Sequence, residues 1–160
     1  MAEQKTNVMR VLEQRKIPYT AHMYPHGDSP VDGATVAQLI GKAPEQVFKT
    51  LVTMSAGKTP YVFVIPALEE LDLKKAAKAV GEKSIAMLHL NELLPLTGYV
   101  RGGCSPIGMK KQFRTTIDDS CLRHQTIVVS AGKIGYQVEL APADLLALVR
   151  GQTTDITVEV

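Results

Sequence analysis

The sequence predicts an α+β fold whose sheet is curved or closed. Short apolar runs rich in β-branched residues are bounded by turns that contain Gly or Pro. Amphipathic segments with capping residues lie between these runs and towards both ends of the chain. The 160 residues show no repeat, linker or low-complexity segment. We therefore expect a single domain that spans residues 1–160.

Helices are expected where helical periodicity follows a residue that can cap or start the first turn. Thr6 precedes such a segment near the N-terminus, and Asp72 precedes another that ends at Gly81. Pro142 suits the first turn of the last helix, and Gly151 would stop it. The expected helices cover residues 7–16, a short segment from Asp32 or Thr35 to Ile40, residues 73–80, a brief helix from its cap Asn91 to Leu94, and residues 142–150.

Strands are expected where β-branched or aromatic residues form short runs between turn residues. The runs at 47–52 and 60–66 are joined by a Gly-containing connection, which indicates an antiparallel pair. Ile156 and Val158 are expected to close the chain as an edge strand. The other expected strands cover residues 18–24, 84–88, 115–117, 126–130 and 136–140.

Lys49 stands in the middle of one of these apolar strands. A strand points alternate side chains to opposite faces, so Lys49 shares one face with Val47 and Leu51, and Thr50 lies on the other. Both faces of this strand carry apolar residues, so neither is expected to face water. Burying an unpaired charge is costly. Lys49 is therefore either a functional cation or a lysine whose stem crosses the edge of the core while its ammonium group reaches water.

A loop at residues 101–108 contains three glycines and one proline. Glycine lets another molecule approach the backbone closely, and Pro106 holds Ser105 in an extended conformation. Such a loop can direct several backbone N–H groups at an oxygen atom of a ligand, although a tight turn would use the same residues. Lys110 and Lys111 follow and could meet phosphates near such a site, or form a solvated face.

Composition and charge exclude several classes of function. The net charge of +2 is too small to imply general nucleic-acid binding. Residues 1–16 carry no apolar signal segment, and no run approaches the roughly 20 apolar residues that span a bilayer. Cys104 and Cys121 form neither a disulfide framework nor a zinc site, and Cys104 has no identifiable histidine partner. A soluble cytoplasmic protein without a metal or a cofactor is expected.

The motifs together resemble a known family. The strand motif Phe48-Lys49-Thr50-Leu51-Val52, the loop motif Arg101-Gly102-Gly103-Cys104-Ser105-Pro106-Ile107-Gly108 and the turn Ser130-Ala131-Gly132 occur in the order and spacing of the YbaK/EbsC proteins. These are free-standing aminoacyl-tRNA deacylases related to the editing domain of prolyl-tRNA synthetase. Within the family, the chain most resembles the members that remove cysteine mischarged on tRNA for proline.

The resemblance implies a mixed, partly closed β-barrel-like sheet flanked by helices, with a pocket between the three motifs. It assigns Lys49 as the essential catalytic residue and needs no metal. Cys104 and Gln137 depart from the family pattern, because relatives usually carry an aliphatic residue and sometimes an acidic residue there. The substrate-binding residues that the resemblance implies are Tyr24, Thr50, Gly102, Gly103, Cys104, Ser105, Pro106, Gly108, Ser130 and Gly132.

The activity that the resemblance implies is hydrolysis of the ester that joins cysteine to the 3′ end of tRNA for proline. The expected partners are aminoacyl-tRNA and a prolyl-tRNA synthetase complex, with no membrane. Two alternatives stay open at this point. The protein could deacylate tRNA charged with alanine or serine, or it could be a catalytically silent module that binds tRNA or a synthetase.

Overall fold

The computed structural model describes residues 5–159, and within them every α-helix is eight residues long. None of these helices is long and apolar enough to cross a membrane. Thr6, Asp32 and Asp72 act as N-caps, because each side chain accepts a backbone N–H from the first turn of its helix. The helices are α1 (Asn7–Gln14), α2 (Gly33–Ile40), α3 (Leu73–Val80), α4 (Leu90–Thr97) and α5 (Pro142–Val149).

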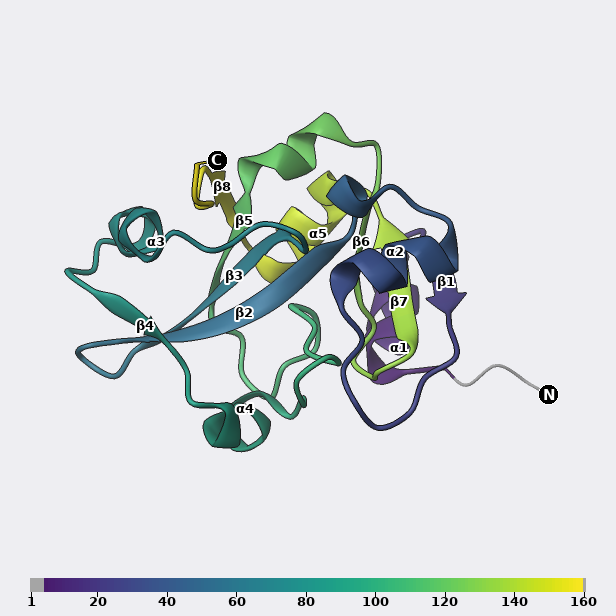
Figure 1. Cartoon of the computed structure of the whole chain (residues 1–160), viewed down its shortest axis with the longest axis horizontal. Coiled ribbons are helices and arrows are strands. Elements are labelled where there is room, and N and C mark those ends of the chain that lie inside the picture. Colours follow the sequence, from purple (N-terminus) through teal and green to yellow (C-terminus); the bar gives the residue numbers. More distant parts are fainter. Residues whose placement is uncertain (1–4, 160) are drawn as a thin grey trace.

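The strands of the described chain form two sheets (Figure 1). The larger sheet has the order β4-β2-β3-β5-β8, and the smaller sheet has the order β1-β7-β6. β2 and β3 are antiparallel, as expected, whereas β5 pairs in parallel with both β3 and β8. The strands are β1 (Thr20–Met23), β2 (Phe48–Ser55), β3 (Pro60–Pro66), β4 (Ile85–Met87), β5 (Arg114–Asp118), β6 (Ile127–Ser130), β7 (Tyr136–Leu140) and β8 (Gln152–Thr154).

The two sheets meet at the beginning of β2 and then separate. Val47 forms an isolated parallel bridge with Val128 of β6. On the same side of β2, β4 pairs only with Thr53–Ser55. Within residues 5–159, the outer edge of β2 between Lys49 and Leu51 therefore has no strand partner. The predicted mixture of helices and mixed sheet is confirmed, although the sheets do not close into a barrel.

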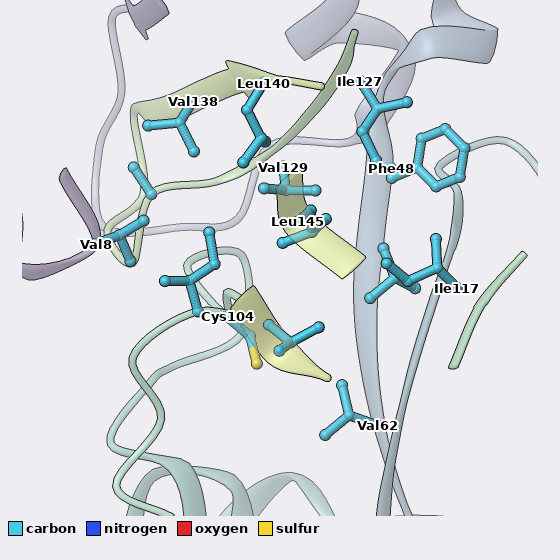
Figure 2. Packing of buried hydrophobic residues seen from close by; sticks show 14 of the residues in the cluster. Val8, Phe48, Val62, Cys104, Ile117, Ile127, Val129, Val138, Leu140 and Leu145 are labelled. Carbon is cyan, nitrogen blue, oxygen red and sulfur yellow. The ribbon is translucent and has the colours of Figure 1, made fainter. Parts of the chain in front are cut away.

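One hydrophobic core joins the two sheets (Figure 2). Val62 and Ile117 come from the larger sheet, and Val129 and Leu140 come from the smaller one. Leu145 of α5 is fully buried in the same cluster. Figure 1 shows α5 behind the β2–β3 pair, where it packs between the sheets. This shared core holds β2 and β6 in place relative to each other where the two sheets separate.

A second, smaller core lies on the opposite face of β2 and β3. It contains Phe63, Ile65 and Ile156 together with Ala76 and Val80 of α3. α3 therefore covers the face of the larger sheet that the main core leaves open. The helix begins and ends where Asp72 and Gly81 predict, because Asp72 caps the first turn and Gly81 takes a left-handed φ of 74°.

Several expected boundaries are wrong. The first helix ends at Gln14 and not at residue 16. The brief helix does not begin at its expected cap, Asn91, but one residue earlier, and it runs on to Thr97 because Leu93 and Leu96 pack against the main core. α5 ends at Val149, and Arg150, in place of Gly151, takes the left-handed conformation that ends the helix. The C-terminal edge strand is Gln152–Thr154, because the N–H of Ile156 donates to the Asp118 carboxylate and Ile156 turns into the smaller core.

Candidate active site

A cavity of about 540 Å³ opens along the free edge of β2, and we call it the first cavity. β2 and the segment before it form one wall, α2 and the preceding loop form another, and the glycine-rich loop and the smaller sheet complete it. The lining residues are Tyr24, Pro30, Val31, Asp32, Gly33, Val36, Val47, Phe48, Lys49, Thr50, Leu51, Ala67, Arg101, Gly102, Cys104, Ser130 and Gln137.

Lys49 and Thr50 line this cavity from opposite faces of the sheet. Lys49 stands opposite Ile65 and shares its face, whereas Thr50 stands opposite Val64 on the face of the main core. Both reach the cavity because the edge of β2 is open at this point. The alternation that the sequence predicts is therefore correct, and it places two different polar groups along one opening.

The Lys49 ammonium group is partly withdrawn from water. Desolvation lowers the pKa of Lys49, and the attraction of Glu70 opposes this effect without cancelling it. Within residues 5–159, Lys49 forms no ion pair and donates no hydrogen bond. A half-buried cation without a protein partner is available to an electronegative atom of a ligand.

The Thr50 hydroxyl is the second free polar group. Its oxygen is buried and has no hydrogen-bond partner among the described residues. Leaving a buried hydroxyl unpaired costs about 1–3 kcal/mol. Since Thr50 lines the cavity, a ligand in the cavity can supply the missing partner.

Glycine is required where the loop meets the residues before α2. Gly102 has a φ of 87°, and a Cβ atom there would lie 2.9 Å from the Cβ of Pro30. Behind it, a Cβ on Gly103 would lie 3.2 Å from the backbone nitrogen of Ile134. The Gly103 N–H donates to the Val100 carbonyl at 3.0 Å. In the described chain, the N–H groups of Gly102, Cys104 and Ser105 have no such acceptor.

Cys104 lines the cavity and also belongs to the main core (Figure 2). Only 8% of the residue is exposed, and burial raises the pKa of its thiol to about 12. The thiol is therefore neutral at physiological pH and is a poor nucleophile. Cys104 shapes the cavity as a small apolar residue.

The smaller sheet contributes Ser130 and Gln137, which face each other across β6 and β7. Both are largely buried, and the Ser130 hydroxyl accepts the Gly132 N–H at 3.1 Å. Tyr24 follows β1 and packs against α2, with its N–H bonded to the Gly135 carbonyl at 3.0 Å. Among the described residues, no histidine lines the cavity to activate a hydroxyl.

The structure thus gathers six of the eleven predicted site residues around the first cavity. These are Lys49, Tyr24, Thr50, Gly102, Cys104 and Ser130. The other five do not line it. Gly103, Ser105 and Pro106 are buried behind it, Gly108 lies under the Tyr99 hydroxyl, and Gly132 lies against the Tyr99 ring.

Sequence reasoning missed the wall formed by α2 and the loop before it. Pro30, Asp32, Gly33 and Val36 come from this wall, and Arg101 adds a second cation at the opening. A Cβ on Gly33 would lie 2.2 Å from the Cβ of Ala67, so α2 sits close against the end of β3. Gly33, in the first turn of a helix capped by Asp32, was the one available signal for this wall. Its partner Ala67 is distant in the sequence, so the sequence alone does not reveal the contact.

A polar network on Glu139 of β7 links β1 to the segment that follows α2. His22 contacts the Glu139 carboxylate at 2.8 Å, Lys42 contacts it at 3.1 Å, and the Thr126 hydroxyl donates to it. Burial alone would raise the pKa of Glu139. The hydrogen bonds from Thr126, His22 and Lys42 outweigh burial and lower the pKa to about 2.

No group of three or more His, Cys, Asp or Glu side chains within residues 5–159 is arranged to hold a metal ion. The polar groups around the first cavity are instead a lysine, hydroxyls, an amide and backbone N–H groups. This set can hold and polarise a carbonyl oxygen or contact a ribose.

Comparisons with known proteins agree with this chemistry. Residues 30–148 match the family model described as the aminoacyl-tRNA editing domain. A protein of Enterococcus faecalis, EbsC, named as a candidate Cys-tRNA(Pro)/Cys-tRNA(Cys) deacylase, is 49% identical over 97% of this chain and 94% of its own length. YwhH of Bacillus subtilis is 30% identical over 68% of this chain and 69% of its own length.

Among solved structures, a candidate trans-editing enzyme for prolyl-tRNA synthetase superposes with a TM-score of 0.83 at 24% identity, over 98% of this chain and all of that one. A protein called APE2540 superposes with a TM-score of 0.84 at 21% identity, over 94% of this chain and 99% of that one. At this level of identity the two structures establish the fold. With the family model and the Enterococcus relative, they show that the chain belongs to the aminoacyl-tRNA editing domain family of YbaK/EbsC type.

Proposed function

We propose that this protein removes cysteine mischarged on tRNA for proline by cleaving the aminoacyl ester. The observation that carries the proposal is the first cavity itself. It places a desolvated, unpaired lysine, an unpaired hydroxyl and the backbone of the glycine-rich loop around one space, with no activated protein nucleophile. The Enterococcus relative, whose name includes Cys-tRNA(Pro), supports this choice of substrate.

The arrangement suits stabilisation of negative charge on the ester oxygen. Backbone N–H groups act as an oxyanion hole when they are held near the position that the oxygen takes in the transition state. The N–H groups of Gly102 and Cys104 lie beside the cavity without an acceptor in the described chain. Lys49 adds a positive charge whose lowered pKa also lets it exchange a proton more readily than a surface lysine.

The substrate itself supplies the nucleophile in this proposal. The family resemblance implies that the cysteine sulfur attacks its own ester carbonyl. The C–O bond to the ribose then breaks, the ribose oxygen takes up the proton that the thiol gives up, and the amino acid leaves as a thiolactone that water hydrolyses. The neutral Cys104 thiol and the absence of histidine from the cavity lining support a route without a protein nucleophile.

Deacylation assays on tRNA for proline charged with cysteine, S-methylcysteine, alanine or serine test the proposal. Attack by the substrate thiol predicts rapid loss of cysteine and little loss of the other three, because only cysteine has a free thiol. Loss of alanine or serine at the same rate would favour the alternative deacylases, in which water attacks. No loss of any of them would favour a silent binding module.

We further propose that a prolyl-tRNA synthetase supplies much of the affinity for tRNA. The net charge of +2 is small for a protein that binds a polyanion alone. We expect weak binding of bulk tRNA at physiological salt, and tighter binding when the synthetase is added in the same titration. The site of action would be the cytoplasm, where tRNA is charged.

A further inference from the structure

A second cavity, of about 490 Å³, lies beside the first one and shares its walls. The same three chain segments line both cavities. Arg101 lines the first and Val100 the second, Pro30 lines the first and Asp28 the second, and Gln137 lines the first and Tyr136 the second. Gly102 of the first cavity lies against Ile134 of the second, since a Cβ atom on Gly102 would be 3.4 Å from the Ile134 side chain, so the cavities are close neighbours. The lining residues are His26, Gly27, Asp28, Gly98, Tyr99, Val100, Gly132, Lys133, Ile134 and Tyr136.

Two aromatic rings form part of the second cavity. The His26 and Tyr136 rings meet edge to face, with centroids 6.1 Å apart and an angle of 61° between their planes. The His26 ring lies directly on the backbone of Gly135, where a Cβ atom would come within 1.9 Å of it. His26 itself is exposed, so its ring offers a fixed and accessible surface on which a base can stack.

Three cations lie on or near the walls of the two cavities. Lys133 lines the second cavity, the stem of Lys110 lies over Gly98, and Arg101 stands at the boundary with the first cavity. All three are exposed, and none forms an ion pair with another residue in the range 5–159. Among the described residues of the lining, Asp28 is the one carboxylate, so positive charge prevails there. An aromatic platform beside unpaired cations fits single-stranded nucleic acid.

We propose that the second cavity binds the nucleotide that precedes the terminal adenosine of a single-stranded RNA 3′ end. The inference rests on the proposed function, which places the aminoacyl ester of that adenosine in the first cavity. The base of the preceding nucleotide stacks on the His26–Tyr136 pair, and Lys133 contacts its phosphate. The open backbone at Gly27, where a Cβ atom would meet nothing within 4 Å, leaves room for the strand.

Binding of uncharged RNA tests the proposal directly. The probes are the trinucleotide CCA and adenosine alone, titrated against the whole protein and against His26→Ala, Lys133→Ala and Lys78→Ala. Lys78→Ala is the matched control, because it removes an exposed lysine from α3 on the other side of the larger sheet. Lys133→Ala changes an exposed side chain, so loss of folding does not complicate its result.

We expect His26→Ala and Lys133→Ala each to weaken trinucleotide binding by about tenfold and to leave adenosine binding unchanged. Lys133→Ala should also lower the slope of log affinity against log salt by about 0.7, the value for one phosphate contact on a single strand. Lys78→Ala should change neither. Unchanged trinucleotide binding in both variants, or an equal loss for adenosine, would overturn the proposal.

Deacylation separates this inference from the proposed function. Both variants should hydrolyse cysteine esterified to adenosine alone at the wild-type rate, and should hydrolyse charged tRNA about tenfold more slowly. A wild-type protein that hydrolyses neither ester would contradict the proposed function. Hydrolysis of both esters at unchanged rates in the two variants would contradict only the second-cavity proposal.

Discussion

At the scale of single residues, Lys49 and Thr50 give the first cavity its polar character. They are neighbours on one strand and point to opposite faces of the sheet, yet the open edge of β2 exposes both to the same space. Each lacks a partner in the described chain, and each therefore costs the fold some stability. Residues kept at such a cost are best explained by a contact with a ligand.

Replacing Thr50 with valine tests this explanation. Valine keeps the shape of threonine and removes the unpaired oxygen, so we expect stability to stay the same or to rise by up to about 1 kcal/mol. Deacylation of charged tRNA should fall by about tenfold, because the substrate loses one hydrogen bond. Urea unfolding and single-turnover deacylation measure the two effects. A stable variant with full activity would show that the Thr50 hydroxyl does not contact the substrate.

At the scale of elements, α2 is the wall that turns an open strand edge into a cavity. Its capped first turn places Gly33 against Ala67, next to the end of β3. Beyond the other end of the helix, Lys42 contacts the Glu139 carboxylate, which also contacts His22 of β1. The position of α2 therefore depends on the contact at Gly33 and on the polar cluster, besides the burial of Val36 and Ala37 in a small hydrophobic cluster. The first two can be changed separately.

Gly33→Ala should move α2 away from β3. The new Cβ atom would lie 2.2 Å from the Ala67 Cβ atom, so the helix must shift. We expect a loss of about 1–3 kcal/mol in unfolding free energy and a drop in deacylation rate. Gly57→Ala in the β2–β3 turn is the control, because the nearest atom would be 3.8 Å away. Equal stability of the two variants would contradict the contact.

Glu139→Gln should lower the free energy of unfolding by an amount that depends on pH. Because the folded pKa of Glu139 is about 2, below the usual 4.5, the carboxylate stabilises the fold above pH 4.5 and loses this effect as the pH falls towards 2. We expect the variant to lose about 2 kcal/mol at pH 7, and the difference from wild type to shrink below pH 4.5.

Urea unfolding at pH 7 and pH 3 measures this change. Glu45→Gln serves as the control, because Glu45 is exposed and forms no ion pair in the described chain. A difference between Glu139→Gln and wild type that stays the same at both pH values would show that the carboxylate does not act through its charge.

Local signals made much of this architecture predictable. Asp72 and Gly81 mark both ends of α3, and the motif around Lys49 correctly indicated which side chains share a face. The turn of the chain at Ile156 depends on the Asp118 carboxylate, 38 residues earlier, which no local pattern reveals. The α2 wall of the cavity likewise depends on contact with Ala67. Tertiary contacts of this kind are where sequence reasoning fell short.

At the scale of the whole molecule, the two sheets share one core. Val62 and Ile117 of the larger sheet pack in the same cluster as Val129 and Val138 of the smaller one. On the faces that the two sheets turn towards each other, they share this one core. The shared core supports the proposal that the chain is a single domain. The site lies between the two sheets and so depends on both.

We therefore expect a single cooperative unfolding transition. Far-UV circular dichroism and tyrosine fluorescence should give the same urea midpoint, since the chain contains five tyrosines and no tryptophan. Two separate midpoints would show that the sheets unfold independently and would contradict the single-domain proposal.

Single-turnover deacylation of tRNA for proline charged with cysteine, compared between wild type and Lys49→Ala, tests the function most directly. Lys58→Ala, at the exposed tip of the same hairpin, controls for loss of charge. We predict that Lys49→Ala lowers the rate by about 100-fold and leaves the protein folded, while Lys58→Ala keeps the wild-type rate. A folded Lys49→Ala protein that deacylates at the wild-type rate would contradict the role of Lys49 as the catalytic residue.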